Sequence, residues 1–469
     1  MQSILVDKRA DSFLFCSFLV LLFWLPLPFG SNRPWAGAIM AVWVFFLCGA
    51  WCWLYFRGEV SFSGALHSAR FVCGLFLFWL LYILFQSIPV PVHWGEWLSP
   101  MAVTHWQLLN PSAQHITLSV DPHSSRAGLF LSMSYVLIFF LALVLVRSHS
   151  RLRQLAYVLV WSAVLQAFYG SLMSLSGLEY GFFIKKYAYL GVATGTFINR
   201  NHLAGYLEMG LAVGIGLLIA SPGSAMAVTW RQRLRDIFQL LLSPKARLRL
   251  YLVIMVVALV LTHSRMGNTA FFTSLLVAGA IGLIFSRHAS HSMVILLISL
   301  VLVDILIVGS WFGLEKVKQR IQQTSLVTES RDEAYADTLD LWSEYPLTGS
   351  GLGSFYAALP KYRAGNYQGF YNHVHNDYLE FLAESGVIGI AVPGLIVMMS
   401  FIMALMAQYQ RRDPLLRGMS FAGIMGITAI LIHSAVDFNL QIPANAATFV
   451  ILLALCWISY GYRVTGHRR

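Results

Sequence analysis

Residues 387–407 read VIGIAVPGLIVMMSFIMALMA, a run without a charged side chain inside an apolar segment at 376–407. About 20 such residues are enough for a helix to cross a bilayer. The apolar residues are continuous rather than placed at every second position, which argues against a transmembrane β-barrel. Eleven other segments share this character: 12–29, 35–56, 70–89, 126–146, 154–175, 201–220, 250–266, 268–286, 292–312, 418–434 and 442–461. The sequence therefore predicts an all-α, polytopic integral membrane protein with about 12 transmembrane helices.

The composition indicates the same class of protein. Apolar residues make up 58% of the 469-residue chain and charged residues 11%, whereas soluble domains contain about 25% charged residues. Soluble globular, disordered and collagen-like proteins are therefore excluded. The first apolar segment follows Lys8 and Arg9 but ends without a small-x-small cleavage site, so we expect a retained span rather than a signal peptide. All five cysteines fall within predicted spans, where thiols pack as apolar side chains.

The net charge of +11 is divided unevenly between the two sides of the membrane. Twenty of the 32 Lys and Arg residues lie in alternate connections, together with five of the 21 acidic residues. These connections carry a net charge of +15, and the remainder of the chain carries −4. Because basic connections stay in the cytoplasm, both termini are predicted to be cytoplasmic. The basic balance reflects topology and does not indicate nucleic-acid binding.

The longest connection on the outer side is 313–375. It contains an apolar stripe at helical spacing, formed by Tyr335, Leu339, Trp342 and Tyr345. The acids opposite, Asp337, Asp340 and Glu344, are interpreted as a solvated face rather than a metal site, since no His or Cys joins them. Glycines at 349–353 predict a tight turn in preference to a nucleotide loop. Asp304, near the middle of a predicted span, is either a protonated structural residue or paired with a neighbour.

Polar residues gather where the segment 376–407 begins. Residues 371–380 read YNHVHNDYLE, and Glu384 follows Glu380 on the same face of a helix. A histidine at a membrane boundary is often structural, but several costly ionisable residues together favour a functional role.

Two other clusters on the outer side can converge with this segment. One is Asn199-Arg200-Asn201-His202 at the start of a span, and the other is Ser264-Arg265 in the turn between two spans. A single Arg at such a boundary can snorkel to lipid head groups. Two guanidinium groups together suit bidentate binding of phosphate.

These motifs resemble those of the bacterial O-antigen ligases and the related O-antigen and exopolysaccharide polymerases. The strongest likeness is His375-Asn376, nine residues, then Gly386-x-x-Gly389. The preceding segment is also similar to the family at Arg331, Trp342, Pro346, Gly349, Gly351, Gly353 and Phe355. The likeness extends over residues 195–460 and includes the clusters around Arg200 and Arg265.

The resemblance implies an organisation like that of C-type membrane glycosyltransferases in the bacterial inner membrane. Its expected parts are N-terminal membrane helices over 1–194, a ligase-related membrane domain over 195–460 with a periplasmic loop at 313–375, and a basic cytoplasmic tail over 461–469. The implied reaction moves a glycan from undecaprenyl diphosphate to a hydroxyl of a saccharide or of lipid A-core, in lipopolysaccharide or surface polysaccharide biosynthesis. The family likeness implies no metal, no cofactor and no nucleotide sugar.

The resemblance also implies roles for individual residues. His375 is the expected general base, because an imidazole titrates near neutral pH, and Glu380 is expected to orient it. His373, two residues earlier in the loop, is expected to have no such anchor. The expected ligands of the diphosphate are Arg200, Arg265 and Arg331, with support from Asn199, His202, Asn376, Asp377 and Glu384.

Two alternatives remain at the level of the sequence. A polymerase uses the same donor as a ligase, so the motifs do not separate these two enzymes. A lipid-linked sugar flippase or transporter would instead be expected to carry charges at the centre of several spans. Here Asp304 is nearly the only such charge.

The predicted topology can be tested with alkaline phosphatase fusions, because this reporter is active only outside the cytoplasm. A fusion at Arg231 should be inactive and a fusion at Leu326 active, since the two positions lie in connections on opposite sides. A fusion at Arg469 should match the one at Arg231. Equal activity at Arg231 and Leu326 would contradict the topology.

Overall fold

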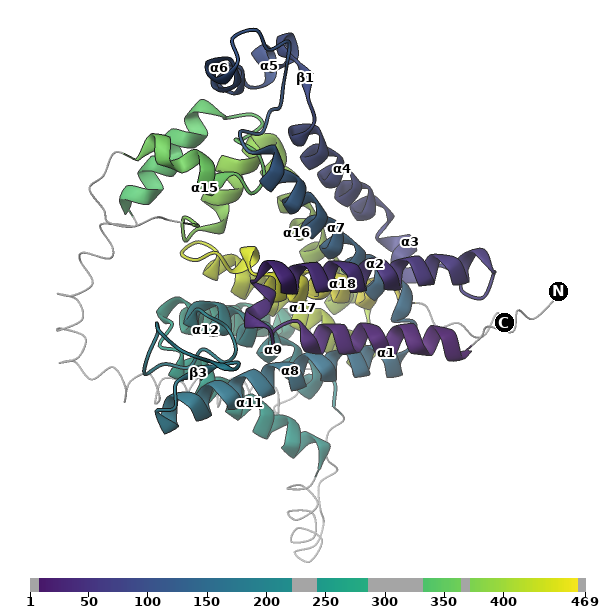
Figure 1. Cartoon of the computed structure of the whole chain (residues 1–469). Coiled ribbons are helices and arrows are strands. Elements are labelled where there is room, and N and C mark those ends of the chain that lie inside the picture. The colour runs from purple at the N-terminus through teal and green to yellow at the C-terminus, as the bar shows by residue number, and fades with distance from the viewer. Residues whose placement is uncertain (1–7, 222–242, 286–331, 364–371, 463–469) are drawn as a thin grey trace, which may run out of the picture.

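The computed structural model describes residues 8–221, 243–285, 332–363 and 372–462. These residues form helices almost throughout, as Figure 1 shows. Irregular connections join the helices, and two of them contain short antiparallel strand pairs: β1 (Val90–Pro91) with β2 (His115–Ile116), and β3 (Tyr180–Gly181) with β4 (Ile184–Lys185). The predicted all-α class is confirmed.

Nine helices within the described ranges are long and apolar enough to cross a membrane. They are α2 (Pro34–Phe56), α4 (Arg70–Ser87), α7 (Pro122–Leu145), α8 (His149–Ser176), α9 (Arg200–Ile219), α12 (Arg265–Ile284), α16 (Asp377–Gln410), α17 (Pro414–His433) and α18 (Pro443–Gly461). The prediction of a polytopic membrane protein is therefore confirmed.

The exact number of spans stays a prediction. Two further predicted spans correspond to α1 (Lys8–Trp24) and α11 (Pro244–Leu261), which are helices outside the set above. The predicted span 292–312, with Asp304, lies outside the described residues.

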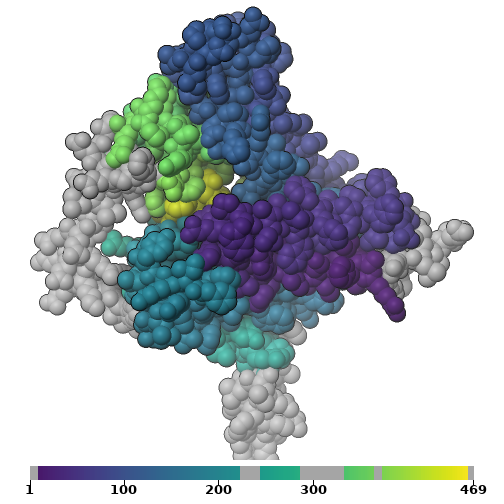
Figure 2. Space-filling model, in the orientation of Figure 1, coloured from purple at the N-terminus to yellow at the C-terminus, as the bar shows by residue number. Residues whose placement is uncertain are grey.

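The shorter helices lie in the connections. They are α3 (Gly64–Ser68), α5 (Val92–Leu98), α6 (Pro100–Leu109), α15 (Phe355–Ala358) and the 3-10 turns η1 (Phe29–Ser31), η2 (Leu359–Tyr362) and η3 (Asn439–Gln441). The α5–α6 pair projects from the rest of the surface at the top of Figures 1 and 2.

The centre of the helix bundle is formed by α9, α17 and α18. In the apolar windows of α9 and α18, 94% of the residues are buried inside the protein, compared with 28% for α2 and α16. The helices α9 and α17 meet at Gly216 and Gly418, where a Cβ on either glycine would collide with the carbonyl oxygen of the other. Small residues that allow such close backbone contact are typical of packed membrane helices.

The helix at 332–344 differs from the predicted amphipathic pattern. Leu339 is 44% exposed and Asp337 only 3%, so the expected apolar stripe is wrong at Leu339 and the expected solvated acidic face is wrong at Asp337. Tyr345 is buried and Asp340 is exposed, as expected. The buried face consists of Ala334, Asp337, Thr338, Leu341 and Tyr345. Tertiary contacts, including Leu341 and Tyr345 in a second apolar cluster with Phe355 and Val374, decide which face is buried.

The apolar segment around Gly386 is one helix interrupted by a break. Gly386 has φ 63° and ψ −175°, a conformation open almost only to glycine. In an uninterrupted helix the N–H groups of residues 387 and 388 would bond to the carbonyls of residues 383 and 384. The break releases these four groups in a segment that begins to cross the membrane, where unpaired backbone groups are costly.

The glycine-containing segment 346–351 supplies partners for all four groups. The N–H groups of Val387 and Ile388 donate to the carbonyls of Pro346 and Leu347 at 3.0 and 3.3 Å. The N–H groups of Ser350 and Gly351 donate to the carbonyls of Ala383 and Glu384, at 2.9 Å each. A Cβ on Gly349 would collide with the Glu384 backbone, so this approach requires glycine. The predicted glycine turn therefore takes part in a set of backbone hydrogen bonds between residues 346–351 and 383–388, which we call the joint.

Helix α4 closes the joint from the other side. The Gln86 amide donates to the carbonyls of Thr348 and Glu384 at 2.7 and 3.0 Å. The Tyr82 hydroxyl reaches the carbonyl of Ser385 at 2.6 Å. Segment 346–351 is thereby fixed to two membrane helices, α4 and α16, and it holds the first three turns of α16 in place.

A glycine comparison tests this joint. Gly386→Ala should destabilise the protein by at least about 1–3 kcal/mol, because the backbone conformation alone costs that much for a residue with a Cβ. Gly394→Ala, in the same helix, is the matched control, since a Cβ there meets no atom within 4 Å. Thermal unfolding in detergent should show a lower midpoint only for Gly386→Ala. Equal midpoints for the two variants would contradict the account.

Candidate active site

His375 lies immediately before α16 in an unusual backbone conformation. Its φ is +57°, in the left-handed region that non-glycine residues seldom adopt. The conformation is held on both sides: the Tyr335 hydroxyl donates to the His375 carbonyl at 3.0 Å, and Asn376 caps α16 by accepting from the Leu379 N–H at 3.2 Å. Strained residues of this kind persist where the surroundings determine them.

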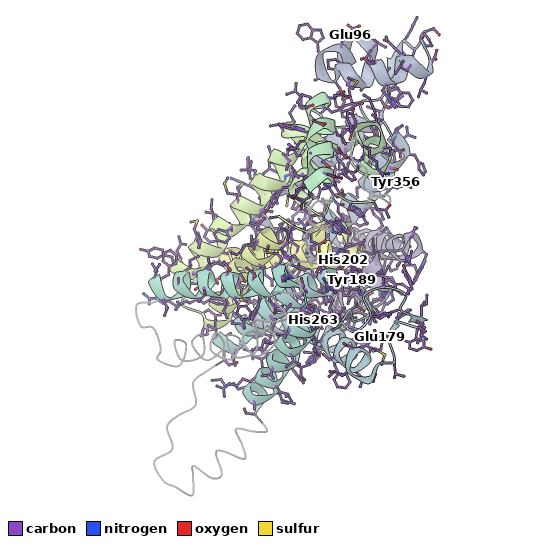
Figure 3. All side chains as sticks on the ribbon, turned by 90° about the vertical axis from the view of Figure 1, so that its left-hand side faces the viewer. Glu96, Glu179, Tyr189, His202, His263 and Tyr356 are labelled. Carbon is purple, nitrogen blue, oxygen red and sulfur yellow. The ribbon has the colours of Figure 1, made fainter. Side chains whose placement is uncertain are left out.

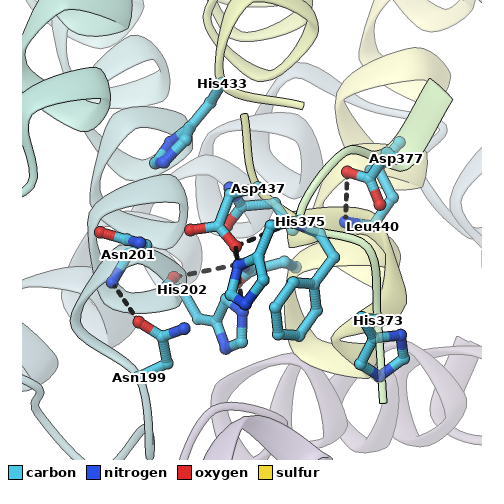
Figure 4. Close-up of polar contacts among 12 residues, drawn as sticks. Asn199, Asn201, His202, His373, His375, Asp377, His433, Asp437 and Leu440 are labelled. Atoms are coloured by element: carbon cyan, nitrogen blue, oxygen red, sulfur yellow. Dashed lines mark hydrogen bonds and ion pairs between the residues drawn. The ribbon is translucent and has the colours of Figure 1, made fainter. Parts of the chain in front are cut away.

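Asp437 is the partner of His375. It lies between α17 and α18, and its Oδ1 is 3.3 Å from His375 Nδ1 and 3.9 Å from His202 Nε2 (Figure 4). The Asp437 side chain is 1% exposed and that of His375 is 21% exposed, so only the imidazole faces the solvent side. Burial alone would raise the pKa of Asp437, but the hydrogen bond with His375 and the nearby His202 and His433 hold that pKa well below its usual range. Asp437 is therefore a buried carboxylate that stays ionised.

Asp377 connects the start of α16 to the same segment. Its N–H donates to the carbonyl of Ser434 at 2.9 Å, and its Oδ2 accepts from the Ser434 hydroxyl at 2.7 Å and the Leu440 N–H at 3.1 Å. Asp377 is 1% exposed. The contacts give it a structural part, since it holds His375 and Asp437 next to each other.

Glu380 contacts His373. Its Oε1 is 2.7 Å from His373 Nδ1, and its Oε2 accepts from the Val374 N–H at 3.1 Å. Burial would lower the pKa of His373, but the Glu380 carboxylate raises it above its ordinary value. The expectation that Glu380 orients His375 is wrong, because its partner is His373. Because the chain turns at His375, Glu380 meets the earlier histidine, and Asp437 takes the orienting position beside His375.

Phe438 brings three histidines together. Its ring centroid is 4.4 Å from that of His373, which stacks on it at an interplanar angle of 20°. The rings of His375 and His202 meet it edge-on at 4.7 and 4.6 Å. One aromatic side chain therefore fixes the spacing of the histidines that come from α9 and from the loop before α16.

The two predicted arginines stand at the starts of neighbouring helices. Arg200 is the first residue of α9, after Asn199, which accepts from the Asn201 N–H at 2.9 Å. Its guanidinium lies 5.8 Å from the ring centroid of Tyr189, which Figure 3 shows below His202 on this face of the protein. Arg265 is exposed and begins α12.

Close packing brings these two helix starts together. A Cβ on Gly267, two residues after Arg265, would meet Ala204 and the Glu208 carboxylate of α9. The first turns of α9 and α12 are therefore in contact, and each carries an arginine beside a helix N-terminus, where anions are favoured. Arg331 lies outside the described residues.

Glu384 does not join the histidines. It is buried, and its Oε1 accepts from the Phe355 N–H at 3.0 Å, so its contacts belong to the joint between α16 and the 346–358 segment. Its shared helix face with Glu380 does not give the two acids a shared partner.

Sequence reasoning missed Asp437, Phe438 and a buried pair formed by His433 and Glu208, whose Nδ1 and Oε1 are 2.8 Å apart. A signal was present. The connection between the last two predicted spans is short, yet it contains Asp437 and Asn439, the same kind of boundary cluster that marked the other candidate segments.

The described ranges contain no candidate metal site. No group of three or more His, Cys, Asp or Glu side chains there is arranged to hold a metal ion. The predicted independence of metal stays a prediction.

The described residues define a polytopic helical membrane protein with a histidine–carboxylate pair beside two arginine-bearing helix starts. Residues 250–394 match the family model for O-antigen ligase. The predicted resemblance to this family is confirmed. No curated protein matches the chain. The matched segment contains Arg265 and His375, whereas Arg200 and Asp437 lie outside it.

Proposed function

We propose that this protein transfers a glycan from undecaprenyl diphosphate to an acceptor hydroxyl on the periplasmic side of the bacterial inner membrane. The family consists of ligases and polymerases that transfer glycans in surface polysaccharide biosynthesis. The observation that carries the proposal is the partly exposed imidazole of His375 held by the buried carboxylate of Asp437.

The pair has the arrangement that a general base requires. With Nδ1–H donating to Asp437, the lone pair of His375 lies on Nε2, and the carboxylate stabilises the imidazolium that forms. The acceptor oxygen bonds to the anomeric carbon, and its proton passes to Nε2. The bond from the anomeric carbon to the diphosphate oxygen breaks, and its electron pair leaves with the diphosphate.

Arg200 and Arg265 are proposed to stabilise the diphosphate leaving group. Negative charge on the diphosphate grows as the glycosidic bond breaks, and fixed cations stabilise such charge. Arg200 and Arg265 sit at helix N-termini that favour anions as well. A guanidinium can also bind two phosphate oxygens at once.

The first prediction concerns the base. His375→Ala should lower glycan transfer from the lipid-linked donor about 10²–10⁴-fold, the usual contribution of a general base. Asp437→Asn should also reduce transfer, because an amide no longer favours the required tautomer. His373→Ala, expressed at a matched level, should lose less. A larger loss of transfer activity in His373→Ala than in His375→Ala would assign the role of general base to His373, with Glu380 as its partner.

The second prediction concerns the diphosphate. Arg200→Ala and Arg265→Ala should each lower transfer about 10²–10³-fold, the range for one lost charge-stabilising donor. Arg→Lys at either position should retain part of the activity, since a point charge lacks the bidentate geometry. Arg33→Ala is the control, because Arg33 is exposed and also lies near an aromatic ring but begins neither helix. Full activity in both Arg→Ala variants would exclude the assignment.

The acceptor decides between ligase and polymerase. Purified protein should be incubated with the lipid-linked donor and either lipid A-core or additional lipid-linked repeat units. Glycan on lipid A-core identifies a ligase, whereas longer lipid-linked chains identify a polymerase. Donor that is not consumed with either acceptor in detergent would support a flippase or transporter, because such a protein moves the donor without breaking it.

A further inference from the structure

A groove opens at the first turns of α8, at the end of the protein opposite the histidine cluster in the predicted topology. It has a volume of about 490 Å³ and is lined by Leu19 of α1 and by Ser150, Gln154 and other residues of α8. This size is within the usual range for small-molecule sites. The groove is formed by residues that have no part in the proposed reaction.

The lining changes from polar to apolar along α8. His149, Arg153, Tyr157 and Trp161 line the groove and are spaced four apart, so they share one face of the helix. From His149 to Trp161 the helix rises about 18 Å, which is close to half of a bilayer's hydrocarbon thickness plus the head-group boundary. In the predicted topology, with the span at 154–175, the polar end lies at the membrane surface and the Trp161 end at the depth of acyl chains.

The polar end carries an available cation. Arg153 is exposed and takes part in none of the ion pairs among the described residues. Its neighbour Arg151 differs, because it pairs with Asp11 at 2.7 Å and covers the Phe15 ring. His149 is held by Asp413 at 3.0 Å, with its side chain still 40% exposed. A guanidinium in this position suits a phosphate group.

We propose that this groove binds one anionic phospholipid, with its phosphate at Arg153 and an acyl chain along Tyr157, Trp161 and Leu19. Ser150 and Gln154 offer hydrogen bonds to the head group. In the predicted topology the lipid belongs to the cytoplasmic leaflet, where basic pockets between helices recognise anionic lipids. The site is separate from the donor site, which the proposed function puts on the periplasmic side.

The bound lipid touches a junction of the bundle. His149 contacts Asp413, and Asp413 caps α17 by accepting from the N–H groups of Leu415 and Leu416. The His149 ring also meets that of Tyr462, after α18, at 4.6 Å. A ligand that binds only the folded protein stabilises it, so lipid binding should raise the midpoint of thermal unfolding.

The test uses the full-length protein, delipidated in detergent and titrated with phosphatidylglycerol or with phosphatidylcholine of the same acyl chains. Native mass spectrometry measures the bound lipid, and thermal unfolding measures stabilisation. The wild-type protein should bind phosphatidylglycerol about tenfold or more tightly than phosphatidylcholine. Arg153→Ala should lose about ten- to a hundredfold in affinity for phosphatidylglycerol, the range for a hydrogen bond to a charged group. Inorganic phosphate should leave the midpoint unchanged, because it has no acyl chain.

Three variants complete the test. Arg70→Ala removes an exposed arginine at the start of α4 that does not line the groove, and it should bind like the wild type. Arg153→Lys keeps the charge and should keep the preference for phosphatidylglycerol. Trp161→Ala should weaken the binding of both lipids, because it removes an aromatic side chain that would contact the acyl chain. Equal affinity of the wild type for both lipids, or an unchanged affinity in Arg153→Ala, would overturn the proposal.

Discussion

The exchange of backbone hydrogen bonds at Gly386 is the interaction on which the end of the protein with the histidine cluster depends. A helix that breaks at the membrane boundary exposes N–H and carbonyl groups that lipid cannot satisfy. Segment 346–351 pairs with those groups, and the Gln86 amide adds hydrogen bonds to the carbonyls of Thr348 and Glu384. The same contacts set the direction of the first turns of α16, and so the positions of Asp377 and Glu380. The candidate site is thus built on a defect in a helix whose hydrogen bonds are all replaced.

Buried charge is concentrated at the same end of the bundle. A lone carboxylate in the interior is costly, but Asp437 has His375 and His202 beside it, and Glu208 has His433. Phe438 contacts the rings of all three histidines without offering them a hydrogen bond. His373 pairs with Glu380, whereas His375 and His202 both lie beside Asp437. These pairings give His373 and His375 different electrostatic surroundings although only one residue lies between them.

The sequence predicts the helices well because the membrane requires long apolar runs, and nine of them appear as helices long enough to span. It also predicts the start of α16, since Asn376 is a good N-cap. Contacts between distant parts of the chain could not be predicted in this way. Asp437 follows His375 by 62 positions, and no local pattern links them. The left-handed turn at His375 assigns Glu380 to His373, and packing buries Asp337; neither follows from helical spacing.

The histidine cluster has a consequence for how this protein can vary. Its members come from the start of α9, the loop before α16 and the connection after α17, and the matched family segment contains only the second of these. Exchanging residues 250–394 with those of a relative would move His375 while leaving Phe438 and Asp437 behind. Such a chimera would combine part of the site from the relative with part from this protein, although the two parts had diverged in separate sequences. Positions 202, 373, 375, 437 and 438 should therefore behave as one inherited unit, in which a change at one is tolerated only with a matching change at another.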